Sequence, residues 1–240
     1  SRSVTSRTAT TRTERAPTDL ELFADGPHPA TGQFEIGDDT LRTEEGVNYE
    51  VSARWEGDAI TLSGSVYRFD FDSFIYLEDT GLIELDPEGD LPIFQFVQAS
   101  ANFTGFEFSA DAQLGNAMGW DWKADGSIDL VRAKLDAGGN LPLIPPMTVN
   151  AGIEGERGIF NGRVEAQYGA EQDDIASFET PTDDYLTFDA RLGIALTDTV
   201  KLMLEARNIT DEEVRVHASP LKDIAPMPGR SFRVALRAEF

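Results

Sequence analysis

Two histidines are the residues of this sequence best suited to bind a transition metal, since it contains no cysteine. His28 stands in the polar stretch Asp25-Gly-Pro-His-Pro-Ala-Thr31, shortly before Glu35, and His217 stands near the carboxyl end. An imidazole with nearby carboxylates suits zinc or another borderline divalent cation. The residues predict that His28 captures a metal together with Asp25 or Glu35, and that His217 is a second candidate ligand. The alternative is a loop histidine that packs without any ligand, and a single imidazole leaves it open.

Patterns typical of enzymes are weak. The Ser63-Gly-Ser65 stretch has no base in a useful sequence context, and no glycine-rich phosphate loop is present. Asp70 and Asp72 share one strand face and could suit acid–base chemistry, but alternation along a strand beside a polar lumen explains them more simply. We therefore expect no enzymatic activity, no catalytic residues and no permanently bound cofactor.

The charge of the chain restricts its partners. Acidic residues number 43 against 20 basic ones in 240 residues, which gives a formal net charge of −23. Nucleic-acid binding requires a basic surface, so we expect no nucleic-acid partner. An acidic surface could gather cations or meet a lipid layer bridged by divalent ions, or serve only solubility. The sequence has no apolar run long enough for a transmembrane helix and no visible signal peptide, so a mature product or a fragment is expected.

The elements that carry these residues are predicted to be strands with one apolar and one charged face. From Ser231 to Phe240, apolar residues alternate with polar ones and the sequence ends on an aromatic residue. About ten residues of this kind form the unit of a transmembrane β-barrel, in which the charged face lines a wet lumen. The same period of two recurs in the segments Val47–Glu56, Phe106–Leu114, Phe160–Tyr168, Leu186–Ala195 and Val200–Arg207.

The connections between these segments alternate between short and long, as in outer-membrane barrels. Short turns are expected at 56–59, 114–119, 155–158 and 197–199, and long loops at 14–46, 78–91, 136–146, 169–184 and 210–230. We predict about ten strands, all with antiparallel neighbours. The segment 4–13 is either a strand that faces the lumen or a frayed end. A phase slip between Val66 and Tyr67 predicts a bulge, and aromatic residues near both strand ends predict two membrane girdles.

Several short motifs occur in an order that resembles the carboxy-terminal part of a TonB-dependent outer-membrane receptor. They are Arg15-Ala-Pro-Thr18, Phe34-Glu-Ile-Gly37 with Leu41 and Glu44, Asn208-Ile-Thr-Asp211, Pro228-Gly-Arg230 with Phe232, and the terminal Phe240. The stretch around His28 resembles the subgroup that includes zinc-uptake receptors.

The resemblance implies a fold, a location and partners. The fold class would be all-β, with residues 1–240 supplying about ten C-terminal strands of an antiparallel barrel of the 22-strand type, without its plug domain. The protein would lie in the cell outer membrane, in contact with its lipid and with the remaining barrel strands, and a TonB-type energy-transducing complex would act through the missing plug.

The resemblance also implies energy-coupled uptake of a scarce nutrient, for which a divalent metal such as zinc is one candidate. The alternatives are a passive porin or structural barrel, a siderophore or haem receptor, and a soluble β-rich binding module.

Overall fold

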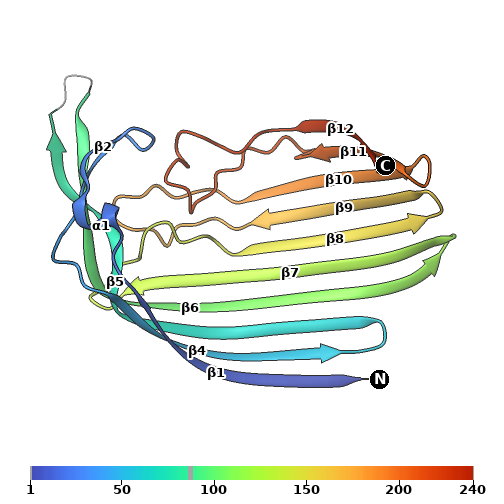
Figure 1. Ribbon diagram of the computed structural model, residues 1–240, viewed down its shortest axis with the longest axis horizontal. Helices are drawn as coiled ribbons and strands as arrows, with labels where there is room; N and C mark the ends of the chain where they lie inside the picture. The colour runs from blue at the N-terminus through green and yellow to red at the C-terminus, as the bar shows by residue number, and fades with distance from the viewer. Residues whose placement is uncertain (1, 86–88, 240) are drawn as a thin grey trace.

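The structure is a computed structural model that describes residues 2–85 and 89–239. Within these residues, ten strands lie side by side in one curved sheet, and the first residues of β1 lie at the same end of it as the last residues of β12 (Figure 1). The strand order along the sheet is β1-β4-β5-β6-β7-β8-β9-β10-β11-β12. The strands are β1 (Ser3–Arg15), β4 (Glu44–Glu56), β5 (Ile60–Glu84), β6 (Leu91–Ala117), β7 (Trp120–Leu135), β8 (Thr148–Arg157), β9 (Phe160–Gly169), β10 (Tyr185–Ala195), β11 (Val200–Arg207) and β12 (Ser231–Ala238).

Every step along this sheet is antiparallel, which confirms the all-β antiparallel prediction. The segment 4–13 lies in β1, which pairs with β4 along its whole length, so it is a strand and not a frayed end. The last predicted strand is β12, although Phe240 itself lies outside the described residues.

The segment 14–46 contains small elements that the sequence analysis did not predict. Helix α1 (Asp19–Phe23) begins at a capping box, in which Thr18 and Glu21 exchange side-chain and backbone hydrogen bonds. Strands β2 (Asp25–His28) and β3 (Gln33–Ile36) form a hairpin, and β3 runs parallel to the loop end of β6. The prediction that all neighbours are antiparallel is therefore wrong at this one pairing.

The two faces of the sheet differ in chemistry in strands such as β9 and β10. In β9 and β10, Val164 pairs with Ala190 and Gly162 pairs with Leu192, whereas the alternate rows pair Glu165 with Asp189 and Arg163 with Arg191. Cross-strand partners share a face, so in these strands the apolar rows lie on one side of the sheet and the charged rows lie on the other. We call the first the outward face and the second the lumen face, because lipid and water require this division in a membrane barrel.

Short turns and long loops alternate as predicted, with one difference. Strands β5 and β6 extend to Glu84 and from Leu91, so most of the expected loop at 78–91 is strand. Residues 86–88 of that loop lie outside the described residues. In Figure 1 this extension rises steeply from the rest of the sheet, beside the β2–β3 hairpin. Among the described residues, no helix is both long and apolar enough to cross a membrane.

The bulge lies further along β5 than predicted. The pairing with β6 is continuous through Val66 and Tyr67 and shifts between Phe71 and Phe74, and again between Asp79 and Ile83. Tyr67 lies opposite Gly105, in the row next to that of Val66, and therefore on the lumen face. The predicted aromatic girdle at this end is wrong for Tyr67, Phe69 and Phe71, because their row is shared with Ser63 and Ser65 rather than with the lipid-facing residues.

Candidate functional site

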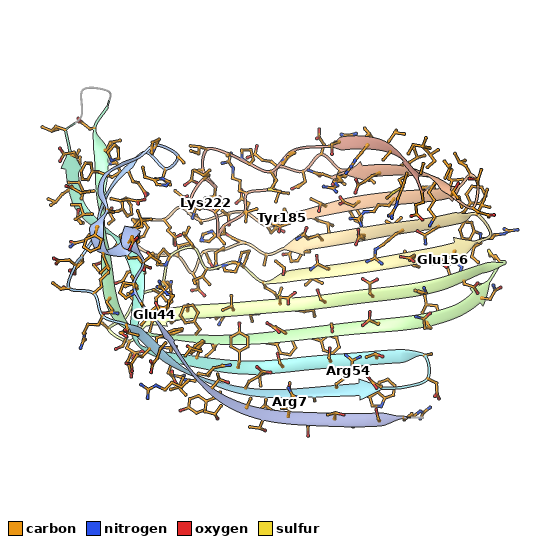
Figure 2. All side chains as sticks on the ribbon, in the orientation of Figure 1. Arg7, Glu44, Arg54, Glu156, Tyr185 and Lys222 are labelled. Atoms are coloured by element: carbon orange, nitrogen blue, oxygen red, sulfur yellow. The ribbon has the colours of Figure 1, made fainter. Side chains whose placement is uncertain are left out.

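Three long loops meet at one end of the strands, which we call the loop end of the sheet. They form what we call the loop layer, made of residues 136–147, 170–184 and 208–230. Their common point is Glu179, whose side chain is 4% exposed. Its carboxylate accepts hydrogen bonds from the backbone N–H groups of Leu143 and Ala176, both at 2.9 Å. Lys222 Nζ lies 3.5 Å from Glu179 Oε1 and is also buried. Figure 2 shows Lys222 at the loop end of the sheet, far from Glu156 at the turn end.

His217 belongs to this same buried group. Its Nε2 lies 3.7 Å from Glu179 Oε1, and its Nδ1 is hydrogen-bonded to the Thr182 hydroxyl at 3.1 Å. Burial raises the pKa of Glu179, but the contact with His217, the two backbone hydrogen bonds and the charge of Lys222 outweigh burial and lower that pKa to about 2. Glu179 is therefore an ionised, fully partnered carboxylate that connects all three loops.

The loops are also joined away from Glu179. The Gln172 side chain donates to the Ile144 carbonyl at 2.9 Å, and the Asn140 side chain donates to the Ile175 carbonyl at 3.1 Å. The Thr180 hydroxyl donates to Asp223 at 2.7 Å. These bonds link the three loops at several points, so the loop layer forms one connected surface at the loop end of the wall.

His28 lies well apart in the sequence, in the hairpin beside β6. Its Nδ1 is hydrogen-bonded to the Thr31 hydroxyl at 3.0 Å. The register pairs His28 with Gln33 and Gly26 with Glu35, so His28 and Glu35 occupy diagonal positions on one face of the hairpin. Asp25 pairs with Ile36 and lies in the alternate row, on the other face.

The four candidate metal ligands are thus not brought together at one site. Glu35 is 7% exposed and shares a hairpin face with His28, whereas His217 lies in the loop layer with both ring nitrogens beside chain partners. In the described part of the chain, no three His, Asp or Glu side chains converge in a geometry that could hold a metal ion. Metal binding at His28, Asp25, Glu35 and His217 stays a prediction.

Charged side chains on the lumen face form a chain of ion pairs that we call the lumen ladder. It crosses strands β7, β9, β10 and β11. Arg163 makes a bidentate contact with Asp125 at 2.6 and 2.8 Å, and its Nε lies 3.0 Å from Glu165. Arg191 bridges Glu165 and Glu205, each at 3.2 Å. Arg207 ends the ladder, 3.0 Å from Glu205. Paired charges of this kind are compatible with a water-filled lumen, and the ion pairs fix the orientation of the donors on this face.

An aromatic cluster also lies on the lumen face, between the ladder level and the loops. Phe69 and Phe71 stack with ring centroids 4.1 Å apart, and Phe74 and Phe103 meet edge to face at 5.1 Å. Phe74 and Phe103 pack against a small buried core of Ala101, Ala133 and Leu141. Leu141 belongs to the loop 136–147, so this loop folds inward onto the wall.

The sequence analysis missed the residues that organise this site. Glu179 stands in an ordinary polar loop sequence, and only contacts with Leu143, His217 and Lys222, distant along the chain, bury it. The ladder was visible only as charge on alternate strand positions. The capping box of α1 was readable, because Thr18 is followed three residues later by Glu21.

The comparison with protein families identifies the class. Residues 2–209 match the family model "TonB dependent receptor-like, beta-barrel". This is most of the chain, so the protein belongs to the TonB-dependent receptor family. The family consists of outer-membrane transport receptors and not of enzymes. The outward apolar face agrees with a location in the outer membrane.

Solved structures of the same fold agree with this assignment. The copper transporter OprC has a TM-score of 0.83 at 22% identity over 99% of this chain and 38% of that one. The siderophore receptor PirA from Acinetobacter baumannii has 0.71 at 17% identity over 99% and 39%. A mutant of the ferric enterobactin receptor PfeA from Pseudomonas aeruginosa has 0.69 at 19% identity over 99% and 38%. The chain therefore spans less than two fifths of the length of these relatives, and it has their fold.

Proposed function

We propose that this chain supplies extracellular loops and wall to an energy-coupled uptake receptor of the outer membrane. The observation that carries the proposal is the connected loop layer over one end of a polar wall face. A substrate caught by the loops would pass the lumen ladder, whose paired arginines and carboxylates offer donors and acceptors along the wall. The complete receptor would require a plug, a TonB-type energy-transducing partner, the remaining barrel strands and the surrounding lipid.

The test of this proposal is the energy dependence of uptake. Cells that carry the complete receptor should accumulate its substrate only while the inner-membrane proton gradient is intact. A protonophore should abolish accumulation without reducing binding at the cell surface. Accumulation that continues at the same rate after the gradient collapses would instead fit a passive porin and would exclude energy coupling.

For the substrate, we propose a divalent metal such as zinc, with His28 and Glu35 as first-contact ligands. Support comes from their shared hairpin face, from the net charge of −23, and from the fold similarity to a transporter whose name specifies copper. Neutral imidazole and ionised carboxylate are the ligating forms, so protons compete with the metal and affinity should fall as the pH is lowered.

The hairpin register provides a matched test of the metal proposal. In the complete receptor under zinc limitation, His28→Ala and Glu35→Gln should both reduce zinc uptake strongly. Asp25→Asn changes a carboxylate in the alternate row of the same hairpin and should reduce uptake much less. Normal growth and uptake with His28→Ala would remove the main support for a metal substrate.

An organic substrate such as a siderophore or haem is the second candidate. The aromatic cluster on the lumen face favours it, because stacked rings bind planar organic groups. Two of the similar structures are named as siderophore or ferric enterobactin receptors. Loss of uptake with Phe69→Ala, combined with normal uptake in His28→Ala, would favour this substrate class over a free metal.

A further inference from the structure

An apolar groove of about 690 Å³ crosses the outward face between β7 and β12. Small residues line its floor, because Gly155 lies opposite Gly162 and Ala190 lies opposite Ala206 in the sheet. Larger apolar side chains border the floor, with Trp122 at one end and Phe232 at the other. Its volume falls within the range of sites that bind small ligands, roughly 300–1,000 Å³.

The floor of this groove is open at Gly162. A Cβ added there would have no neighbour closer than 4.0 Å, whereas one added at Gly155 would lie 2.8 Å from the Trp122 ring. The indole therefore covers Gly155, whereas the space above Gly162 at the bottom of the groove is open. Because this face contacts lipid, the hydrocarbon chains of the lipid fill such a space.

The turn end of the groove has the features of a membrane interface. Trp120 and Trp122 lie together with ring centroids 5.9 Å apart, as in the aromatic girdles of barrels. Arg157 lies beside them, with its Nε 3.6 Å from the position of a Cβ at Gly119, which precedes Trp120. Arg157 pairs across the turn with Phe160, in the outward row. Its neighbour Glu156 faces the lumen and pairs with Lys123 at 3.8 Å.

Arg157 is thus an outward cation at the lipid–water boundary, and in residues 2–85 and 89–239 it has no ion-pair partner. The chain as a whole is strongly acidic and repels anions, so attraction of an anion to this surface depends on a cation such as Arg157. We propose that the groove binds one acyl chain of an anionic phospholipid from the periplasmic leaflet, with the lipid phosphate beside Arg157. Basic side chains at a membrane surface attract anionic headgroups in this way.

The test compares lipid binding by variants of the complete receptor. The purified receptor is examined by native mass spectrometry with phosphatidylglycerol or phosphatidylethanolamine as the probe. The unmodified receptor should retain one phosphatidylglycerol at least about fivefold more tightly than phosphatidylethanolamine. Gly162→Leu fills the groove and should remove this tight binding. Ala112→Leu adds the same side chain to the outward face of β6, outside the groove, and should retain it.

The Arg157 variants test the headgroup separately from the groove. Arg157→Gln should make binding of the two lipids equal, and Arg157→Lys should restore the preference, since it keeps the charge. This series remains decisive if Gly162→Leu fails to assemble. Equal binding by Gly162→Leu and Ala112→Leu, or no headgroup preference in the unmodified receptor, would overturn the proposal. A receptor dimer that Gly162→Leu disrupts would assign the groove to a second copy and overturn it as well.

Discussion

The strand wall and the loop layer are held together by different means. In the wall, each inner strand pairs with two neighbours and the edge strands β1 and β12 pair with one each. In strands such as β9 and β10, alternate residues separate an apolar outward face from a charged lumen face. In the loop layer, one buried carboxylate, Glu179, joins three loops through Leu143, Ala176 and Lys222. The wall distributes its stability over many repeated contacts, whereas the loop layer concentrates its stability in a few buried polar groups.

The largest expected effect tests whether the stability of the loop layer depends on its buried polar groups. Glu179→Leu would leave the Lys222 charge buried without a counterion and remove the acceptor for two backbone N–H groups. Breaking a buried pair in this way costs about 3–5 kcal/mol, here as local unfolding of the loops. Limited proteolysis of the complete receptor should cut within 136–147, 170–184 or 208–230 while the barrel stays folded.

The matched control for this change is Glu213→Leu, in the same layer. The Glu213 side chain is 66% exposed, and its one ion pair among the described residues is with Arg215 at 2.8 Å. Exposed pairs contribute little, so its proteolysis should resemble that of the unmodified receptor. Equal protease resistance in Glu179→Leu would show that the loop layer does not depend on the buried carboxylate.

The second prediction concerns the two faces of the wall. Val164 lies on the outward face in the middle of β9, so Val164→Arg would place a charge in lipid at a cost of roughly 2–4 kcal/mol. The amount of heat-resistant folded receptor in outer membranes should fall. Gln167→Arg adds the same side chain to the lumen face of the same strand and should assemble normally. Similar losses from both variants would contradict the assignment of the faces.

A smaller effect is expected within the lumen ladder. Arg163→Gln removes a bidentate contact with Asp125 and an ion pair with Glu165, and should lower the free energy of unfolding by about 1–2 kcal/mol. Arg12→Gln removes a more exposed pair with Glu45 and should cost less than about 1 kcal/mol. Thermal unfolding of the two receptor variants in detergent measures the difference, and an equal shift would show that the ladder adds no more stability than an exposed ion pair.

The smallest effect is a pH dependence at the start of the loop region. Burial raises the pKa of Glu21, but hydrogen bonds from Arg15 and Thr18 outweigh it and hold that pKa below 4.5. Because the pKa of Glu21 is lower in the folded state, the stabilisation that its ionised carboxylate gives is fully present above pH 4.5. This stabilisation is lost as the pH falls through the folded-state pKa. After correction for intrinsic exchange rates, amide hydrogen exchange in α1 should be faster at pH 3 than at pH 5. Glu21→Gln should remove the difference, and an unchanged difference would assign it to another group.

Periodicity made the wall predictable from sequence, and its limits explain the errors. The alternation in β9, β10, β11 and β12 follows directly from the need for one lipid-facing and one wet face. The bulge was misplaced because Tyr67, Phe69 and Phe71 suggest an apolar row facing lipid, whereas these rings lie on the lumen face. Aromatic packing under a folded loop overrides the simple rule there.

The loop layer has no comparable pattern in the sequence. Glu179 and Lys222 lie 43 residues apart, and nothing near either residue indicates that both are buried. The segments of β5 up to Glu84 and of β6 from Leu91 contain acidic residues that are typical of a loop. They are strands because they pair with each other beyond the point where β7 ends. Short-range signals did exist for α1, in the spacing of Thr18 and Glu21.

The orientation of the wall in the outer membrane is the central claim, and site-specific labelling tests it most directly. Asp173 lies in the loop layer and Asp198 in the short turn between β10 and β11, both exposed. In the complete receptor on intact cells, a membrane-impermeant thiol reagent should label Asp173→Cys and should reach Asp198→Cys only after the outer membrane is permeabilised. Labelling of Asp198→Cys on intact cells, with Asp173→Cys protected, would contradict the account.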